Sequence, residues 1–172
     1  MSEHQITILL LEDDASLSLL LSEELELDGY RVTRASTVNE GCRLLADETP
    51  DLVVSDLRLP DGDGLELLKA AQTDGHSLPF IIITAFGTVD QAVDALKAGA
   101  DDFLTKPLST DHLRLKIRRL LTQADLSRQL QQFLAHKGAD DSLGLIGEHE
   151  SMARLRSDIR QIARSEAAVL IC

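Results

Sequence analysis

Five short apolar segments, separated by longer segments of helical periodicity, make up the first two thirds of the chain. Ile6–Leu11, Leu52–Asp56 and Phe80–Thr84 are apolar almost throughout, which is typical of strands buried on both faces of a parallel sheet. Arg31–Ala35 alternates polar and apolar residues, as a half-exposed edge strand does. Asp102–Thr105 is the fifth predicted strand.

Helical spacing of apolar residues predicts the segments between these strands. Asp14 is expected to cap the first helix, and Ser36 or Thr37 the second. A third helix is predicted from about Leu65 to Gln72, and the last one begins near Ser109. The residues expected to face inward are Leu17, Leu20, Leu21 and Leu25 in the first helix, Val38, Cys42 and Leu45 in the second, and Val89, Ala92, Val93 and Leu96 in the fourth.

Strands that alternate with helices predict an α/β fold with a parallel sheet and helices on both faces. Right-handed crossovers leave few ways to wind five such units. We expect a doubly wound, flavodoxin-like (βα)5 domain whose five-stranded sheet has the order 2-1-3-4-5. In this topology the ligand crevice lies at the carboxyl ends of the strands, beside the first strand.

Composition and charge narrow the class of protein. Of the 172 residues 44% are hydrophobic but only 3% aromatic, so the core must be mainly aliphatic. A formal net charge of −12 argues against nucleic-acid binding by these residues, which needs a basic surface. Two distant cysteines do not make a disulfide framework or a metal knuckle, which favours a reducing, cytoplasmic setting. The sequence contains no apolar run of about 18 residues and no signal peptide, so we expect no membrane contact.

Chemically active side chains follow four of the predicted strands. Glu12 and Asp13 follow the first strand, Asp56 ends the third, Thr84 ends the fourth and Lys106 follows the fifth. All five lie at one edge of the sheet, where gathered carboxylates repel one another and call for a cation. Oxygen ligands with room for water suit Mg²⁺. Asp56 is then a candidate nucleophile toward phosphorus, with the ammonium of Lys106 and the hydroxyl of Thr84 contacting the phosphoryl oxygens.

Residues 5–121 resemble the receiver domain of two-component response regulators. The resemblance rests on the acidic pair Glu12-Asp13, on Asp56 in Ser-Asp-Leu-Arg-Leu-Pro-Asp-Gly-Asp-Gly, on Thr84-Ala85 and on Phe103-Leu104-Thr105-Lys106-Pro107. It implies that Asp56 accepts a phosphoryl group from a sensor histidine kinase.

The same resemblance implies roles for the neighbouring residues. Asp13, Asp56 and the backbone carbonyl of Arg58 would ligate Mg²⁺, and Glu12 would act through water. Thr84 and Phe103 would form a switch pair. The Lys106–Pro107 peptide bond would be cis, which is plausible because proline follows. The residues expected at the pocket rim are Arg58, Ala85, Phe86 and Pro107.

The last helix is predicted to run on to about Lys137, further than a receiver domain requires. Leu113, Ile117, Leu120 and Ala124 form a heptad seam, which Leu126, Leu130 and Phe133 continue after a shift of register. This pattern leaves two interpretations open, a coiled coil or one long helix packed on its own domain. Gly138–Ser142 has the composition of a linker.

Residues 143–172 resemble the opening of the AAA+ ATPase domain of sigma-54-dependent activators of the NtrC type. The resemblance rests on Gly144–Met152, on the helical spacing of Leu155, Ile159 and Ile162, and on the apolar run Ala167–Cys172. No Gly-x-x-x-x-Gly-Lys-Ser/Thr phosphate-binding motif is present, so these residues are not expected to hydrolyse ATP.

The sequence therefore predicts a receiver domain (1–122), a helical linker with a possible coiled coil (123–142) and an incomplete AAA+ fragment (143–172). The expected partners are a sensor histidine kinase and a second copy, bound through the face of helix 4, strand 5 and helix 5 and through the linker helix. Sigma-54 RNA polymerase and DNA would be reached only through further domains.

Two other functions are alternatives to a phosphorylation switch that controls an attached ATPase. A stand-alone receiver that binds proteins when phosphorylated is the first alternative. An aspartyl phosphatase of the haloacid dehalogenase type is disfavoured, because Arg58 stands where that family has a second aspartate.

Overall fold

A computed structural model describes residues 5–73, 78–85, 89–140, 152 and 154–155. The chain divides into two compact units, Met1–Leu126 and Ser127–Cys172. The first unit holds a five-stranded sheet in which every neighbouring pair is parallel. Its strand order, β2-β1-β3-β6-β7, is the predicted order 2-1-3-4-5. The strands are β1 (Thr7–Leu11), β2 (Arg31–Ala35), β3 (Leu52–Asp56), β6 (Phe80–Thr84) and β7 (Asp102–Thr105).

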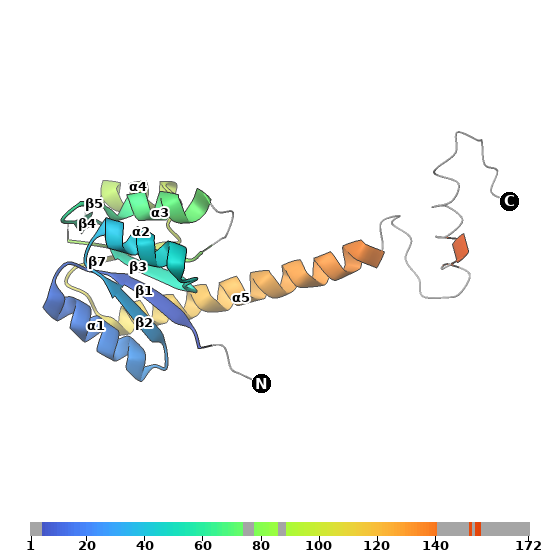
Figure 1. Ribbon diagram of the computed structural model, residues 1–172, viewed down its shortest axis with the longest axis horizontal. Helices are drawn as coiled ribbons and strands as arrows, with labels where there is room; N and C mark the ends of the chain where they lie inside the picture. Colours follow the sequence, from blue (N-terminus) through green and yellow to red (C-terminus); the bar gives the residue numbers. More distant parts are fainter. Residues whose placement is uncertain (1–4, 74–77, 86–88, 141–151, 153, 156–172) are drawn as a thin grey trace. The chain divides into compact units, whose positions relative to one another are not determined.

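Helices cover both faces of this sheet, which confirms the doubly wound α/β fold (Figure 1). Residues of α2, α3 and α4 pack on one face, and residues of α1 and α5 pack on the other. The helices are α1 (Ala15–Leu27), α2 (Val38–Asp47), α3 (Gly64–Thr73), α4 (Val89–Lys97) and α5 (Thr110–Asp140).

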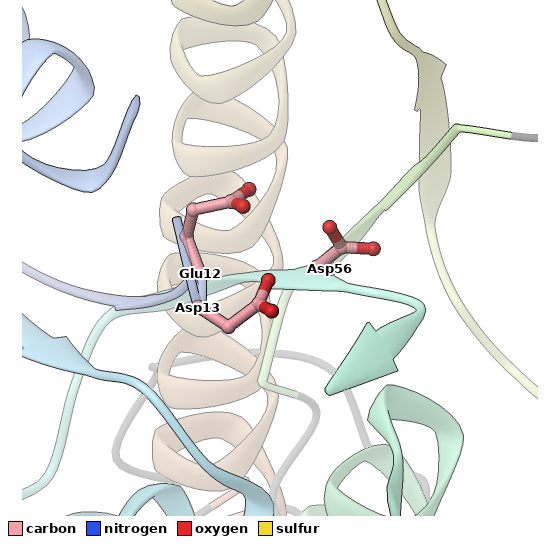
Figure 2. Close-up of side chains that lie close together, drawn as sticks. All are labelled: Glu12, Asp13 and Asp56. Atoms are coloured by element: carbon pink, nitrogen blue, oxygen red, sulfur yellow. The ribbon is translucent and has the colours of Figure 1, made fainter. Parts of the chain in front are cut away.

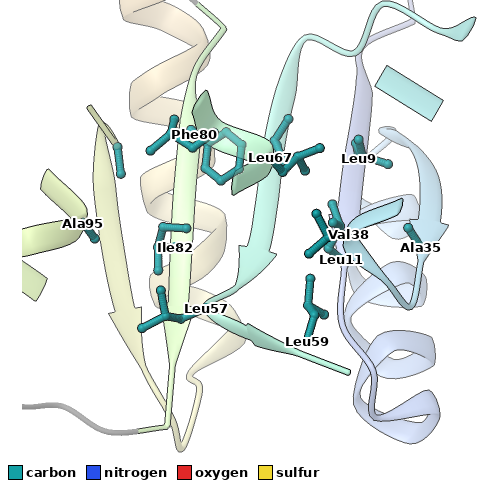
Figure 3. Close-up of a cluster of buried hydrophobic side chains, with 13 residues drawn as sticks. Leu9, Leu11, Ala35, Val38, Leu57, Leu59, Leu67, Phe80, Ile82 and Ala95 are labelled. Carbon is teal, nitrogen blue, oxygen red and sulfur yellow. The ribbon is translucent and has the colours of Figure 1, made fainter. Parts of the chain in front are cut away.

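Each central strand contributes to two separate cores, since successive side chains point to opposite faces of a sheet. On β1, Leu9 and Leu11 face α2 and α3, whereas Ile8 and Leu10 face α1 and α5. Figure 3 shows the first of these cores, which is built from aliphatic side chains around Phe80. Burial on both faces explains why these strands read as continuous apolar runs.

The predicted inward face of α1 is confirmed for Leu17, Leu21 and Leu25, which pack in one core cluster, but is wrong for Leu20. Leu20 is 50% exposed, and the buried residues are Ser18, Leu21, Ser22 and Leu25. The leucine-rich sequence allows several apolar stripes, and packing selects the one that includes two small serines. The hydroxyl of Ser22 donates a hydrogen bond to the Leu19 carbonyl, so its burial leaves no donor unpaired.

The inward face predicted for α4 is also wrong where the structure describes it. Val93 and Leu96 are 38% and 43% exposed, while Ala95 is 1% exposed and lies in the core. A small side chain at the contact lets α4 pack closely on the sheet, and the larger aliphatic residues are left on the outer surface. The side chains of Val89 and Ala92 lie outside the described residues.

A short hairpin occupies the segment after Asp56 that the sequence indicated only as a turn. Strands β4 (Arg58–Leu59) and β5 (Gly62–Asp63) pair antiparallel. Helix α3 begins at the next residue, and the Asp63 carboxylate accepts the Leu65 N–H at 2.9 Å. The hairpin thus links the end of β3 to the start of α3.

The seam on α5 has two parts with different surroundings. Leu113, Ile117 and Leu120 are at most 5% exposed and belong to the core on the α1 face of the sheet. Leu126 and Leu130 are 66% and 57% exposed. The first half of the seam therefore packs in the core of the first unit. Only the second half is exposed and available for the predicted coiled coil.

Helix α5 ends at Asp140, beyond its predicted end near Lys137, and includes the first residues of the predicted linker. One glycine costs a helix only about 1 kcal/mol relative to alanine, so Gly138 does not have to end it. Most of the predicted AAA+ fragment lies outside the described residues. In the described part of the chain, no helix has the length and apolar character needed to cross a membrane.

Candidate functional site

Three carboxylates meet at the carboxyl edge of the sheet, as predicted from their places at the ends of strands. Glu12 and Asp13 directly follow β1, and Asp56 is the last residue of the neighbouring strand β3. One oxygen of each side chain lies within 4.8 Å of the others, and Figure 2 shows the three groups side by side. Glu12 and Asp56 are 2% and 5% exposed, whereas Asp13 is open to solvent.

Lys106 bridges two of these carboxylates from the end of β7. Its Nζ lies 2.5 Å from Asp56 Oδ2 and 2.9 Å from both carboxylate oxygens of Glu12. The directed hydrogen bond goes to Oε1 of Glu12, which leaves the buried Oε2 close to the ammonium charge but without a hydrogen bond. The backbone N–H of Lys106 donates to the Thr84 carbonyl at 2.8 Å, and the Lys106–Pro107 bond is cis, as predicted.

The ionisation of this cluster follows from burial and from the bridging ammonium. Burial raises the pKa of Glu12, and the hydrogen bond and charge of Lys106 oppose that rise only in part. Burial alone would lower the pKa of Lys106, but its hydrogen bonds to Asp56 and Glu12 and their charges outweigh this and raise it. Lys106 is therefore a fixed cation, and one ammonium among three carboxylates leaves the cluster acidic.

Asp56 is held by contacts from its own loop. Its Oδ1 accepts the backbone N–H of Arg58 at 3.0 Å, and its main-chain carbonyl accepts the Ser55 hydroxyl at 2.9 Å. Gly64 passes so close that an added Cβ would lie 2.7 Å from Ser55 Oγ and closer still to the Asp56 carbonyl oxygen. Sequence reasoning did not find the roles of Ser55 and Gly64, although the Asp-Gly-Asp-Gly turn was a signal of a tight backbone approach.

The predicted switch residues lie on adjacent strands. Thr84 is 3% exposed at the end of β6, and Phe103 on β7 is partly buried against the core. Ile82 is the register partner of Phe103, and Thr84 stands two residues beyond Ile82. Because side chains alternate along a strand, Thr84 and Phe103 are diagonal neighbours on one face of the sheet.

The predicted rim residues are only partly described. Arg58, Ala85 and Pro107 are exposed. Ala85 and Pro107 directly follow Thr84 and Lys106 in the sequence, and Arg58 lies two residues after Asp56. Phe86 lies outside the described residues.

The donor set fits a small, hard divalent cation. All three side chains offer oxygen, which Mg²⁺ prefers, and the exposure of Asp13 leaves space for the waters that Mg²⁺ retains. The buried Glu12 Oε2, without a hydrogen bond of its own, adds a further acceptor on the inner side.

Comparison with known proteins identifies this arrangement. Residues 8–118 match the response regulator receiver domain family. The chain belongs to this family. Receiver domains bind Mg²⁺ in an acidic pocket and act as signalling domains that receive phosphoryl groups from sensor kinases. In this chain Glu12, Asp13 and Asp56 form a cluster of acidic residues.

Curated relatives of the chain include a transcriptional regulatory protein and a response regulator protein. The chain is 36% identical over 171 residues to the transcriptional regulatory protein ZraR of Klebsiella oxytoca, an alignment that covers 99% of this chain and 38% of that protein. It is 38% identical over 163 residues to the response regulator protein PilR of Pseudomonas aeruginosa, covering 95% of this chain and 35% of PilR. The chain thus spans less than two fifths of the length of these relatives.

Solved structures show the same fold. The signal receiver domain of a LuxO repressor protein from Vibrio parahaemolyticus matches with a TM-score of 0.70 at 31% identity, covering 73% of this chain and 97% of that one. NtrX from Brucella abortus matches with a TM-score of 0.73 at 28% identity and covers 92% of this chain and 35% of that one.

Proposed function

We propose that Asp56 is the residue of this receiver domain that accepts a phosphoryl group from the phosphohistidine of a sensor histidine kinase, in the cytoplasm. An Asp56 carboxylate oxygen attacks phosphorus and forms a P–O bond as the P–N bond to imidazole breaks. The electron pair of the broken bond returns to the imidazole nitrogen, which takes up a proton. The observation that carries this proposal is the buried carboxylate of Asp56, held by the Arg58 N–H and Lys106, beside the Glu12–Asp13 pair.

The neighbouring residues have complementary roles in this proposal. Lys106, with its raised pKa, supplies a positive charge to the phosphoryl oxygens, and the Thr84 hydroxyl supplies a hydrogen bond. Asp13, Asp56 and the Arg58 carbonyl would hold Mg²⁺, with Glu12 acting through water. When bound, Mg²⁺ neutralises charge on the oxygens of the transferring group.

The same site suggests how the phosphoryl group is sensed. Phosphorylation adds roughly 1.5 to 2 negative charges and three acceptor oxygens. Thr84 would move toward them, and Phe103 would turn into the space that Thr84 leaves. The diagonal position of Phe103 on the same face of the sheet supports this coupling. The change would reach the surface formed by α4, β7 and α5.

We further propose that the chain is the N-terminal part of a sigma-54-dependent activator of the NtrC type, in which this switch controls oligomerisation and an ATPase. ZraR and PilR, which align over nearly all of the chain, support this assignment. Val93 and Leu96 on α4 and Leu115 on α5 are exposed apolar residues available to a dimer, as are Leu126 and Leu130 in the linker helix. A stand-alone receiver that binds other proteins when phosphorylated is the alternative.

The decisive experiment measures intact mass after incubation with acetyl phosphate and Mg²⁺, and oligomeric state with beryllofluoride and Mg²⁺. Asp56→Ala is the test variant, and Asp47→Ala, an exposed carboxylate on α2, is the control. We expect one phosphoryl adduct and a change of oligomeric state in the wild type and the control, and neither in Asp56→Ala. Phosphorylation of Asp56→Ala to the wild-type level would rule out Asp56 as the acceptor. Phosphorylation without a change of state would favour the stand-alone receiver.

A further inference from the structure

Asp61, at the tip of the β4–β5 hairpin, makes three hydrogen bonds to the start of α2. Its Oδ1 accepts the backbone N–H of Val38 at 2.7 Å. Its Oδ2 accepts both the backbone N–H and the side-chain amide of Asn39, each at 2.9 Å. These partners are 23 and 22 residues away in sequence, so the contact joins two separate parts of the fold.

The start of α2 needs acceptors that its own residues do not supply. The first N–H groups of a helix have no partner within the helix. Thr37 is the N-cap, and its hydroxyl accepts only the N–H of Glu40. Asp61 accepts two further N–H groups, those of Val38 and Asn39, and its negative charge faces the positive end of the helix dipole.

The other end of the same hairpin touches the phosphoryl acceptor. Arg58 opens the hairpin, and its N–H donates to Asp56 Oδ1 at 3.0 Å. Within the hairpin Arg58 pairs with Asp63. Leu59 is 8% exposed and shares a core cluster with Val38. Only three positions separate the anchored Asp61 from the backbone N–H that holds the Asp56 carboxylate.

We infer that Asp61 is a positioning residue for the phosphoryl-acceptor site, which acts by anchoring the β4–β5 hairpin to α2 so that the Arg58 N–H stays on Asp56. The inference rests on the proposed function of Asp56 and adds to it a residue that does not touch the phosphoryl group. A rigid hairpin presents the N–H and carbonyl of Arg58 at fixed positions beside Asp56. A hairpin released from α2 samples other positions, and the pocket is assembled for a smaller fraction of the time.

The test compares two variants that each remove one capping side chain from the start of α2. Asp61→Ala removes the anchor of the hairpin, whereas Thr37→Ala removes the N-cap without touching the hairpin. The first readout is amide hydrogen exchange of Arg58, corrected for global unfolding measured in urea. Loss of a capping contact corresponds to about a five-fold change in the equilibrium between the closed hairpin and the locally opened one, from which the amide exchanges. We expect exchange about five-fold faster in Asp61→Ala and unchanged in Thr37→Ala.

The second readout is the initial rate of Asp56 phosphorylation by acetyl phosphate with Mg²⁺. We expect it to fall about five-fold in Asp61→Ala and to stay near the wild-type rate in Thr37→Ala. If Asp61→Ala does not fold, Asp61→Asn replaces it, since an amide keeps one acceptor oxygen and should give an intermediate effect on both readouts.

The possible results separate this inference from the proposed function. Equal effects of the two variants would overturn the inference, because Asp61 would then serve only the stability of α2. Wild-type exchange of Arg58 in Asp61→Ala would overturn it as well. If the wild type accepts no phosphoryl group, the proposed function fails, while Arg58 exchange still decides whether Asp61 anchors the hairpin.

Discussion

Gly64 offers a test of how tightly the backbone is packed around Asp56. A Cβ at this position would lie 2.7 Å from Ser55 Oγ and closer to the Asp56 carbonyl oxygen, which is main chain and has no rotamer to change. Gly62, two residues earlier and in the β4–β5 hairpin, is the matched control. Its nearest neighbours would be the carboxylate oxygens of Glu66 at 3.3 Å, at the end of a flexible side chain.

The expected cost follows from these distances. Forcing an extra carbon into a packed site costs about 1–3 kcal/mol. Restricting the unfolded chain by a Gly→Ala change returns about 0.4–1 kcal/mol. We therefore expect Gly64→Ala to lower the free energy of unfolding by about 1–2 kcal/mol. Gly62→Ala should be neutral or stabilise the protein by less than about 1 kcal/mol, because Glu66 turns aside at little cost.

Urea unfolding of the two variants and the wild type measures both values. Because the clash lies against Asp56, Gly64→Ala should also weaken the response to beryllofluoride and Mg²⁺, while Gly62→Ala should not. A Ser55→Ala background separates the two contacts of the added carbon. If it restored the full stability of Gly64→Ala, the hydroxyl and not the Asp56 carbonyl would be the obstacle. Equal stabilities of Gly64→Ala and Gly62→Ala would refute the reasoning altogether.

Three further predictions concern the rest of the domain. Ile117 is fully buried, so Ile117→Ala should lower the free energy of unfolding in urea by about 2–5 kcal/mol. Leu115 is 67% exposed on the same helix, so Leu115→Ala should lower it by less than about 0.5 kcal/mol. Similar losses in the two variants would contradict the packing of α5. The hydrogen bond from Arg114 lowers the pKa of Asp28 in the folded protein. This carboxylate therefore stabilises the fold fully at pH values above its pKa in the unfolded chain, which is about 3.9. The stabilisation is lost as the pH falls through the lower pKa of the folded state. The stability difference between wild type and Asp28→Asn should thus be full at neutral pH and shrink in acid, and a constant difference would count against the ion pair. Burial, with the charges of nearby acids, raises the pKa of Cys42. In a variant whose other cysteine is replaced by serine, the thiol of Cys42 should therefore react with a disulfide reagent at pH 8 more slowly than free cysteine does, and faster once urea unfolds the protein. A rate that urea leaves unchanged would argue against the raised pKa.

The sequence alone determined the sheet, its order and the edge at which the chemistry gathers. The run Ile6–Leu11 could be recognised because a strand buried on both faces is almost continuously apolar, here with Thr7 as the one polar residue. Alternation of strands and helices then leaves few topologies. In the resulting topology, the residues at or just after the carboxyl ends of β1, β3, β6 and β7 meet at one edge of the sheet. Glu12, Asp56 and Lys106 could therefore be grouped, although Glu12 and Lys106 are 94 residues apart in the chain.

Tertiary structure decided which helical faces are buried and how the site is held. Leu20 and Leu96 are as apolar as the residues buried beside them, and only the fit of small Ser18 and Ala95 against the sheet assigns the inner face. Both parts of the heptad seam of α5 are apolar, yet Ile117 belongs to a core cluster of the first unit and Leu130 is exposed. Asp61 reads as an ordinary turn aspartate, and its anchoring contact exists only because folding brings the start of α2 beside the hairpin. Local periodicity reports what a segment favours, whereas burial and long-range hydrogen bonds depend on neighbours that the segment does not encode.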